Sequence, residues 1–230
     1  ATGAALHSGA GLVTACIPQS GLTALNVSLP EAMFLRREFL QKATLNKYQA
    51  VAIGPGLGVD KEQSQLLDYL LKQNQPLVLD ADALNIIANN KHLLDKIPQK
   101  SIITPHLKEF DRLFGEHPNW WQRVETARQK AQALQIVIVL KNQYTFIALP
   151  TGEVCINPTG NPAMAQGGMG DVLTGMIASF MAQSYTCEQA AILGVYLHGK
   201  TGDALAENQG VIAASTLSKA IPKILRECHQ

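Results

Sequence analysis

Short apolar runs alternate along the chain with longer segments in which apolar residues recur every three or four positions. The runs hold four to six residues, many of them Val, Ile or Leu, which is typical of strands buried on both faces of a parallel sheet. The longer segments have the periodicity of amphipathic helices. The runs are 48–53, 76–79, 101–104 and 136–140, and the clearest helical segments are 61–73, 83–90 and 120–134. This alternation predicts an α/β fold with a mostly parallel central sheet and helices on both faces.

The segments before and after this core are less regular. Small residues and glycines ahead of an apolar run predict a helix end followed by a strand at 12–17, and 34–43 is predicted to form a short helix. Apolar stretches on both sides of Pro-Thr-Gly at 150–152 predict a late antiparallel hairpin. Two more helices are expected at 188–205 and 215–226.

Glycines and carboxylates follow two of the predicted strands. The carboxyl ends of parallel strands meet at one edge of a sheet, where ligand crevices open. Gly-Pro-Gly-Leu-Gly at 54–58 suits such a crevice, although a glycine-rich stretch taken alone favours a tight turn into the next helix. Asp80 and Asp82 come directly after the next strand. They could hold a metal through water, orient a hydroxyl group, cap the following helix or make a structural hydrogen bond.

The third strand leads into a histidine. His106 follows Pro105, and a histidine at a third successive strand end favours contact with a ligand over a purely structural role. Thr104 is a candidate cap for the helix that contains Glu109. His198, within the predicted helix near the carboxyl end, is expected to serve structure and not chemistry.

Glycines gather most densely between Asn157 and Gly175, where a loop leads into an apolar helix. The first N–H groups of a helix lack partners within it, and the helix dipole favours an anion there. Glycine lets the backbone come close to such an anion. The stretch formed by Gly167, Gly168, Met169 and Gly170 therefore predicts a phosphate site.

Asp171 follows these glycines directly. A carboxylate beside an anion site repels a resting phosphate, yet it can accept the proton of a hydroxyl group that attacks one. The alternative is that Asp171 simply caps the helix. The whole stretch favours the catalytic interpretation.

The composition favours a small-molecule partner. Lys and Arg number 19 and Asp and Glu 18, so no excess charge attracts nucleic acid or an anionic membrane. No apolar run approaches the roughly 20 residues needed to span a bilayer. We predict one domain over 1–230, and the lack of a visible signal peptide favours the cytoplasm. Cysteines without metal or disulfide spacing agree with that; they are Cys16, Cys155, Cys187 and Cys228.

With these motifs in view, the chain resembles the ADP-dependent NAD(P)H-hydrate dehydratases, which form the carboxy-terminal half of bifunctional nicotinamide nucleotide repair proteins and belong to the ribokinase-like superfamily. The resemblance covers nearly the whole chain. Its motifs are Ser-Gly-Ala-Gly-Leu-Val at 8–13, Gly-Pro-Gly-Leu-Gly at 54–58, Leu-Asp-Ala-Asp-Ala-Leu-Asn at 79–85, Thr-Pro-His at 104–106, and Asn-Pro-Ala-Met-Ala-Gln-Gly-Gly-Met-Gly-Asp-Val-Leu-Thr-Gly at 161–175.

The resemblance implies repair of the hydrated, redox-inactive form of NADH or NADPH. ADP would phosphorylate the hydroxyl group of the hydrate, releasing AMP, and phosphate would then leave as the ring double bond returns. Asp171 would be the catalytic base and contact the substrate, together with Gly58 and His106. Mg²⁺ is expected to accompany the phosphates. The family also implies a homo-oligomer, specifically a tetramer.

The nucleotide would bind Gly170 and a loop after the fourth strand, by the same resemblance. That loop departs from the family pattern Lys-Gly-Ala-Gly-Thr, because two glycines are replaced. Their bulk could crowd the loop, or the tyrosine could stack on a base. The loop residues are Lys141, Asn142, Gln143, Tyr144 and Thr145.

The start of the chain also departs from the family. The strand and substrate loop that precede this point in relatives are absent before Ala1, as is the fused epimerase domain, so a truncation is expected. Two alternatives to the dehydratase stay open. One is a ribokinase-like kinase of a small vitamin precursor such as hydroxyethylthiazole, and the other is a nucleotide-binding protein without catalytic activity.

Overall fold

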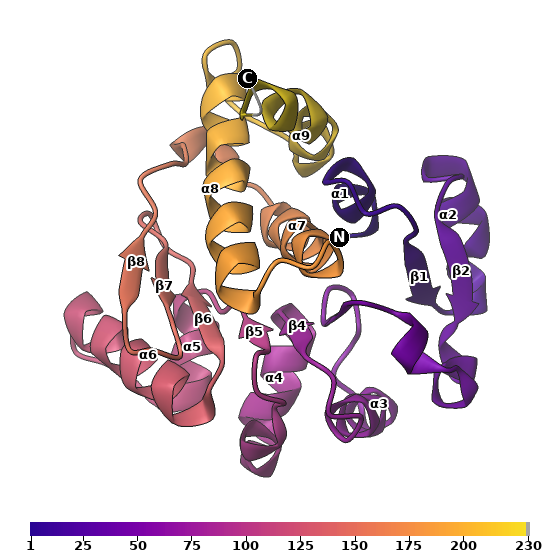
Figure 1. The fold of residues 1–230 in the computed structure, drawn as a ribbon, viewed down its shortest axis with the longest axis horizontal. Helices are drawn as coiled ribbons and strands as arrows, with labels where there is room; N and C mark the ends of the chain where they lie inside the picture. Colours follow the sequence, from indigo (N-terminus) through magenta and orange to yellow (C-terminus); the bar gives the residue numbers. More distant parts are fainter. Residues whose placement is uncertain (229–230) are drawn as a thin grey trace.

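The computed structural model describes residues 1–228, and a six-stranded sheet runs through the centre of these residues (Figure 1). The first four strands pair in parallel and the last two are antiparallel. Strand order follows the sequence: β3 (Val51–Ile53), β4 (Leu77–Leu79), β5 (Ile102–Ile103), β6 (Val137–Leu140), β7 (Phe146–Ala148) and β8 (Val154–Ile156). The predicted mostly parallel sheet and late hairpin are confirmed.

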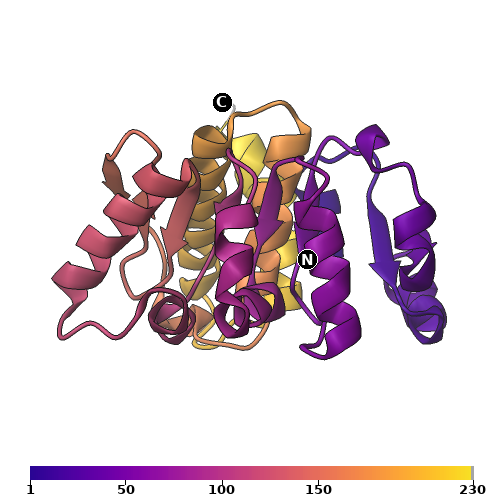
Figure 2. The same ribbon diagram turned by 90° about the horizontal axis from the view of Figure 1, so that it is seen from below.

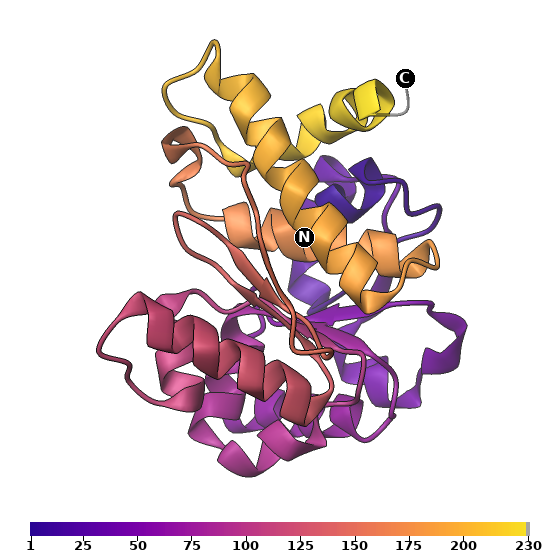
Figure 3. The ribbon, with the colours of Figure 1, turned by 60° about the vertical axis from the view of Figure 1, so that its left-hand side comes forward.

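Helices cover both faces of this sheet, as Figure 3 shows. One layer contains α3 (Lys61–Leu71), α4 (Ala81–Asn89), α5 (Leu107–Phe114) and α6 (Trp120–Leu134), and the other contains α1 (Thr2–His7), α7 (Met169–Ala182), α8 (Cys187–Ala206) and α9 (Ala214–Cys228). The strands are apolar throughout because their residues alternate between two cores. Leu77 and Leu79 pack toward the first layer, whereas Val78 packs toward the second.

A smaller two-stranded parallel sheet lies beside β3 (Figures 1 and 2). It contains β1 (Thr14–Ile17) and β2 (Met33–Arg36), which are joined through η1 (Gln19–Gly21) and α2 (Leu22–Ser28). The helix predicted at 34–43 is therefore wrong in its first part. Phe34 pairs with Ala15 and Leu35 with Cys16, and this pairing outweighs local preference. Short 3₁₀ turns follow at η2 (Arg37–Lys42) and η3 (Leu45–Lys47), and η4 (Lys91–Lys96) and η5 (Pro162–Met164) lie further along.

An apolar cavity of about 270 Å³ separates the two sheets. All of β1 and all of β3 line it, and so do small side chains of α7, including Ala178 and Ala182. Within residues 1–228, β1 pairs only with β2 and β3 only with β4. Two strand edges with unused backbone hydrogen-bonding groups therefore face this space.

None of the helices found in residues 1–228 is both long enough and apolar enough to cross a membrane.

Candidate active site

The carboxyl ends of the parallel strands bring the predicted site segments together. The backbone of Lys141 continues the sheet next to His106, with which it forms a parallel bridge, and its N–H donates to the Pro105 carbonyl at 2.9 Å. The N–H of Asp80 donates to the Ile53 carbonyl at 3.1 Å. Lys141, a candidate nucleotide-binding residue, thus lies next to His106, a candidate substrate-binding residue, at the carboxyl ends of adjacent strands.

The amino terminus of α7 lies above this edge. Gly168 is its N-cap, with a left-handed φ of 88°, and the Val172 N–H makes the first helical bond, to the Gly168 carbonyl at 3.1 Å. The N–H groups of Met169, Gly170 and Asp171 precede that bond and have no partner within the helix. The Met169 side chain is buried, so only its backbone faces the loop. This geometry can accept an anion.

Asp171 lies in the first turn of α7 and is partly buried. The helix-cap alternative is wrong, because Gly168 occupies the capping position and no side chain caps the helix. No salt bridge within residues 1–228 involves Asp171. Its carboxylate therefore lies in the same turn as the free N–H groups and makes no ion pair of 4.0 Å or less within the described residues.

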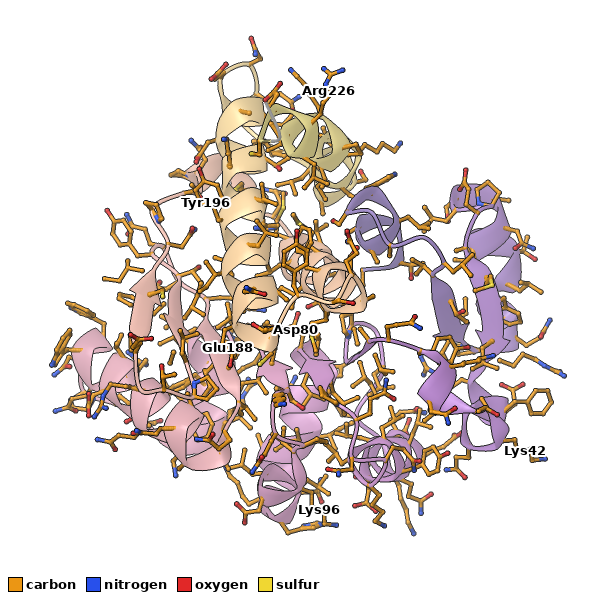
Figure 4. All side chains as sticks on the ribbon, in the orientation of Figure 1. Lys42, Asp80, Lys96, Glu188, Tyr196 and Arg226 are labelled. Carbon is orange, nitrogen blue, oxygen red and sulfur yellow. The ribbon has the colours of Figure 1, made fainter. Side chains whose placement is uncertain are left out.

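Asp80 forms a buried connection between the sheet and α7. Its Oδ1 accepts from the Lys141 ammonium group at 2.8 Å, and its Oδ2 accepts from the Thr174 hydroxyl at 2.7 Å. Figure 4 marks Asp80 near the centre of the molecule, and only 1% of this residue is exposed. The sequence did not predict this connection. Its one signal is Thr174, a polar residue on an otherwise apolar part of α7.

Asp82 holds the glycine loop. Its Oδ2 accepts from the Gly58 N–H at 2.9 Å, and Arg37 donates to the Leu57 carbonyl of the same loop at 3.0 Å. Asp80 occupies the N-cap position of α4, as one alternative expected, but neither its carboxylate nor that of Asp82 makes a capping hydrogen bond to the helix. Ala81, between them, has a left-handed φ of 48°. Such strain in a residue other than glycine persists where the surroundings impose it, and it is common at functional sites.

His106, not Thr104, caps the helix that contains Glu109. The His106 Nδ1 accepts from the N–H groups of Lys108 at 3.1 Å and Glu109 at 3.3 Å. The His106 backbone N–H in turn donates to Glu109 Oε2 at 2.9 Å. Thr104 is buried and its hydroxyl lies 3.5 Å from the Leu79 carbonyl oxygen. Since Nδ1 accepts, a neutral imidazole carries its proton on Nε2, which lies 3.4 Å from Glu109 Oε1 on a side chain that is half exposed.

The loop after β6 is open to solvent. Asn142, Gln143 and Tyr144 are exposed, Tyr144 by 59%, and Thr145 is partly buried. The two residues that replace family glycines, Asn142 and Tyr144, are therefore both exposed to solvent. Crowding of the nucleotide loop by these residues and stacking of Tyr144 on a base both stay predictions.

Helix α8 holds the loop that leads into α7. The Thr159 hydroxyl donates to the Tyr196 carbonyl at 2.9 Å, and Asp203 accepts from the Gly160 N–H at 3.0 Å (Figure 4 labels Tyr196). The His198 Nε2 lies 3.1 Å from the Met169 carbonyl oxygen, and burial lowers the pKa of this imidazole to about 4. A neutral His198 donates to that carbonyl, which is a structural role, as predicted.

Comparison with known proteins agrees with this geometry. A model of the NAD(P)H-hydrate dehydratase family matches residues 1–223. The bifunctional NAD(P)H-hydrate repair enzyme of Moorella thermoacetica is 41% identical over 99% of this chain, which spans 46% of that relative. The ADP-dependent (S)-NAD(P)H-hydrate dehydratase of Bacillus subtilis is 36% identical over 96% of this chain, which spans 80% of that one.

Solved structures show the same relationship. The ADP/ATP-dependent NAD(P)H-hydrate dehydratase from Bacillus subtilis, co-crystallized with ATP/Mg²⁺ and soaked with CoA, has a TM-score of 0.84 and 33% identity over 98% of this chain and 84% of that one. A ribokinase-like superfamily protein from Enterococcus faecalis has a TM-score of 0.87 and 33% identity over 98% of this chain and 80% of its own. The chain belongs to the NAD(P)H-hydrate dehydratase family, whose members are lyase-type enzymes with a ribokinase-like fold.

Proposed function

We propose that this chain dehydrates the S-epimer of hydrated NADH or NADPH at the expense of ADP, giving NAD(P)H, AMP and phosphate. The observation that carries the proposal is the position of Asp171, which forms no salt bridge within the described residues and lies in the same turn as the free N–H groups of α7. Lys141 and His106 lie at the sheet edge below. A base, an anion site and a cation are the parts that phosphoryl transfer requires.

In the first step, the hydroxyl oxygen of the hydrate bonds to the terminal phosphorus of ADP, and the bond from that phosphorus to the AMP oxygen breaks. Asp171 takes the hydroxyl proton. The N–H groups of Gly168 to Gly170 and the Lys141 ammonium group stabilise the charge on the transferred phosphoryl oxygens. Asn142 to Thr145 complete the nucleotide site.

In the second step, phosphate leaves with the electrons of the carbon–oxygen bond, assisted by the lone pair of the ring nitrogen. The neighbouring carbon then loses a proton to the departing phosphate or to water, and the electrons of that carbon–hydrogen bond restore the double bond. Gly58 and His106 hold the substrate in place, with His106 donating from Nε2. The glycine loop is fixed for this purpose by Asp82.

Mg²⁺ would enter with the nucleotide. Within residues 1–228 no group of three or more His, Cys, Asp or Glu side chains is placed to hold a metal ion. The carboxylates of Asp80, Asp82 and Glu109 already accept hydrogen bonds from the protein. Because these carboxylates are already engaged, the site suits a Mg²⁺ ion that is held mainly by phosphate oxygens and water. Such an ion would neutralise part of the phosphate charge.

The test is incubation of the chain with NADH hydrate and ADP, and in parallel with ATP, while near-ultraviolet absorbance and free phosphate are followed. We expect recovery of absorbance together with equal amounts of AMP and phosphate. A stable phosphorylated substrate without recovered absorbance would instead identify a kinase. Nucleotide binding without phosphate release would identify a protein without catalytic activity.

We also propose that the domain includes one further strand, seated between β1 and β3. Both edges there are unused within the described residues, and the cavity between them is apolar along the full length of both strands. Ala1, at the start of α1, lines the same cavity. A parallel strand in this position would join the two sheets and lead into α1 by a short connection. Homo-oligomeric assembly and a cytoplasmic location remain predictions.

Joining a strand-forming segment to Ala1 through a short flexible linker tests the proposed strand. About six apolar β-branched residues match the usual strand length. We expect this extension to raise the urea midpoint of unfolding, because it buries apolar surface and satisfies both edges. The matched control has the same composition with a central proline, which cannot complete the ladder. Equal midpoints for the two extended proteins would contradict the proposed strand.

A further inference from the structure

The buried carboxylate of Asp80, directly after β4, accepts hydrogen bonds both from Lys141, directly after β6, and from Thr174 in α7. Its two partners, Lys141 and Thr174, are 61 and 94 positions away in the sequence. Both carboxylate oxygens are occupied, and the side chain is 2% exposed. A buried carboxylate is costly unless it is paired and hydrogen-bonded, and Asp80 satisfies both conditions.

The Lys141 ammonium group lies directly over the first turn of α7. A Cβ atom at Gly170 would be 3.1 Å from the Lys141 Nζ, so the lack of a side chain at this position leaves room for the ammonium group. The amino end of a helix carries partial positive charge, which repels a cation. Lys141 would therefore turn toward solvent without an opposing charge, and Asp80 provides that charge.

Thr174 extends the link to the helix that carries Asp171. The two residues are three positions apart on α7, about one turn of helix. The bond from the Thr174 hydroxyl to Asp80 therefore ties the first turns of α7 to the end of β4. One carboxylate thus fixes both the ammonium group and the helix that bears the candidate base.

We propose that Asp80 is a positioning residue of this site, which holds the Lys141 ammonium group against the first turn of α7 so that cation and backbone N–H groups bind the same phosphoryl group. The proposal rests on the function proposed above, because it concerns the same phosphate. Asp80 itself does not touch the nucleotide. It acts through Lys141.

A double-mutant cycle tests this role. We expect Asp80→Asn, which keeps the shape of the side chain, to lower kcat/KM for ADP by about 10- to 100-fold, the loss that misplacement by about 1 Å can cause. Lys141→Met should lower it at least as much. The double variant Asp80→Asn/Lys141→Met should be no worse than Lys141→Met alone, because Asp80 has nothing left to position.

The second arm uses Thr174. Thr174→Val removes the hydroxyl group at nearly constant volume, and we expect it to lower kcat/KM less than Asp80→Asn does. Thr174→Ser keeps the hydroxyl group and should retain most of the original kcat/KM. Asp111→Asn is the matched control, because it breaks another ion pair of 2.8 Å, between Asp111 and Arg123 in α5 and α6. It should lower the midpoint of thermal unfolding while leaving KM for ADP and kcat unchanged.

The outcomes separate this inference from the proposed function. If the unaltered chain fails to restore NADH from its hydrate, the proposed function is wrong whatever the variants do. If the unaltered chain is active and Asp80→Asn retains its kcat/KM, Asp80 does not position Lys141. The positioning role is also wrong if Asp80→Asn causes its full loss in the Lys141→Met background. Calorimetric binding of ADP to each folded variant checks the same cycle without turnover.

Discussion

The variant Asp171→Asn is expected to lose about 10²- to 10⁴-fold in turnover, the usual contribution of a general base. An amide cannot take the proton of the attacking hydroxyl group. The fold and AMP binding should change little, because Asp171 neither caps α7 nor forms a salt bridge within the described residues. Steady-state rates with NADH hydrate and ADP, together with calorimetric AMP binding, measure both effects.

A second result would separate this role from simple electrostatics. The asparagine variant lacks the negative charge that opposes bound phosphate, so its affinity for AMP should stay equal or rise slightly. Comparable turnover in the two proteins would rule out Asp171 as the base. Loss of both turnover and AMP binding would indicate a structural role for this carboxylate.

Gly54→Ala is expected to cause a large loss of stability. A Cβ atom at this position would lie 1.7 Å from the Asp80 carbonyl oxygen, and Gly54 has a φ of 131°, which other residues rarely adopt. The end of β3 would have to move away from β4. We expect a loss of more than about 4 kcal/mol in the free energy of unfolding. Thermal unfolding should shift downward by on the order of 10 °C.

Gly56→Ala is the matched control for this change. Gly56 also has a positive φ, of 63°, but no atom lies within 4 Å of its Cβ position. Its cost is therefore only that of left-handed backbone, about 1 kcal/mol. If the two variants unfold at the same urea concentration, the close packing of Gly54 against the Asp80 carbonyl group does not determine the stability of this part of the sheet.

The apolar pattern alone predicted most of the central sheet. The runs that became β4 and β6 are buried on both faces, so every residue in them is apolar and the signal is strong. The prediction failed at β2, whose residues Phe34 and Leu35 become a strand by pairing with β1. Pairing between distant segments is not encoded in local periodicity.

The sequence determined the kinds of chemistry at this site. Free N–H groups at a glycine-rich helix start, and a carboxylate beside them, follow from residue types and their order. The chain also determined that His106, Asp80 and the residues after β6 reach one edge, since parallel strands end on the same side.

Only the tertiary structure decided which side chains act on which. Asp80 was open to metal binding, hydroxyl orientation or helix capping, and it pairs with Lys141 because β4 and β6 both end beneath α7. Asp82, two residues later, points instead to the glycine loop. A sequence fixes the order of its residues and their chemical nature, but side chains 61 or 94 positions apart meet only through the packing of strands and helices.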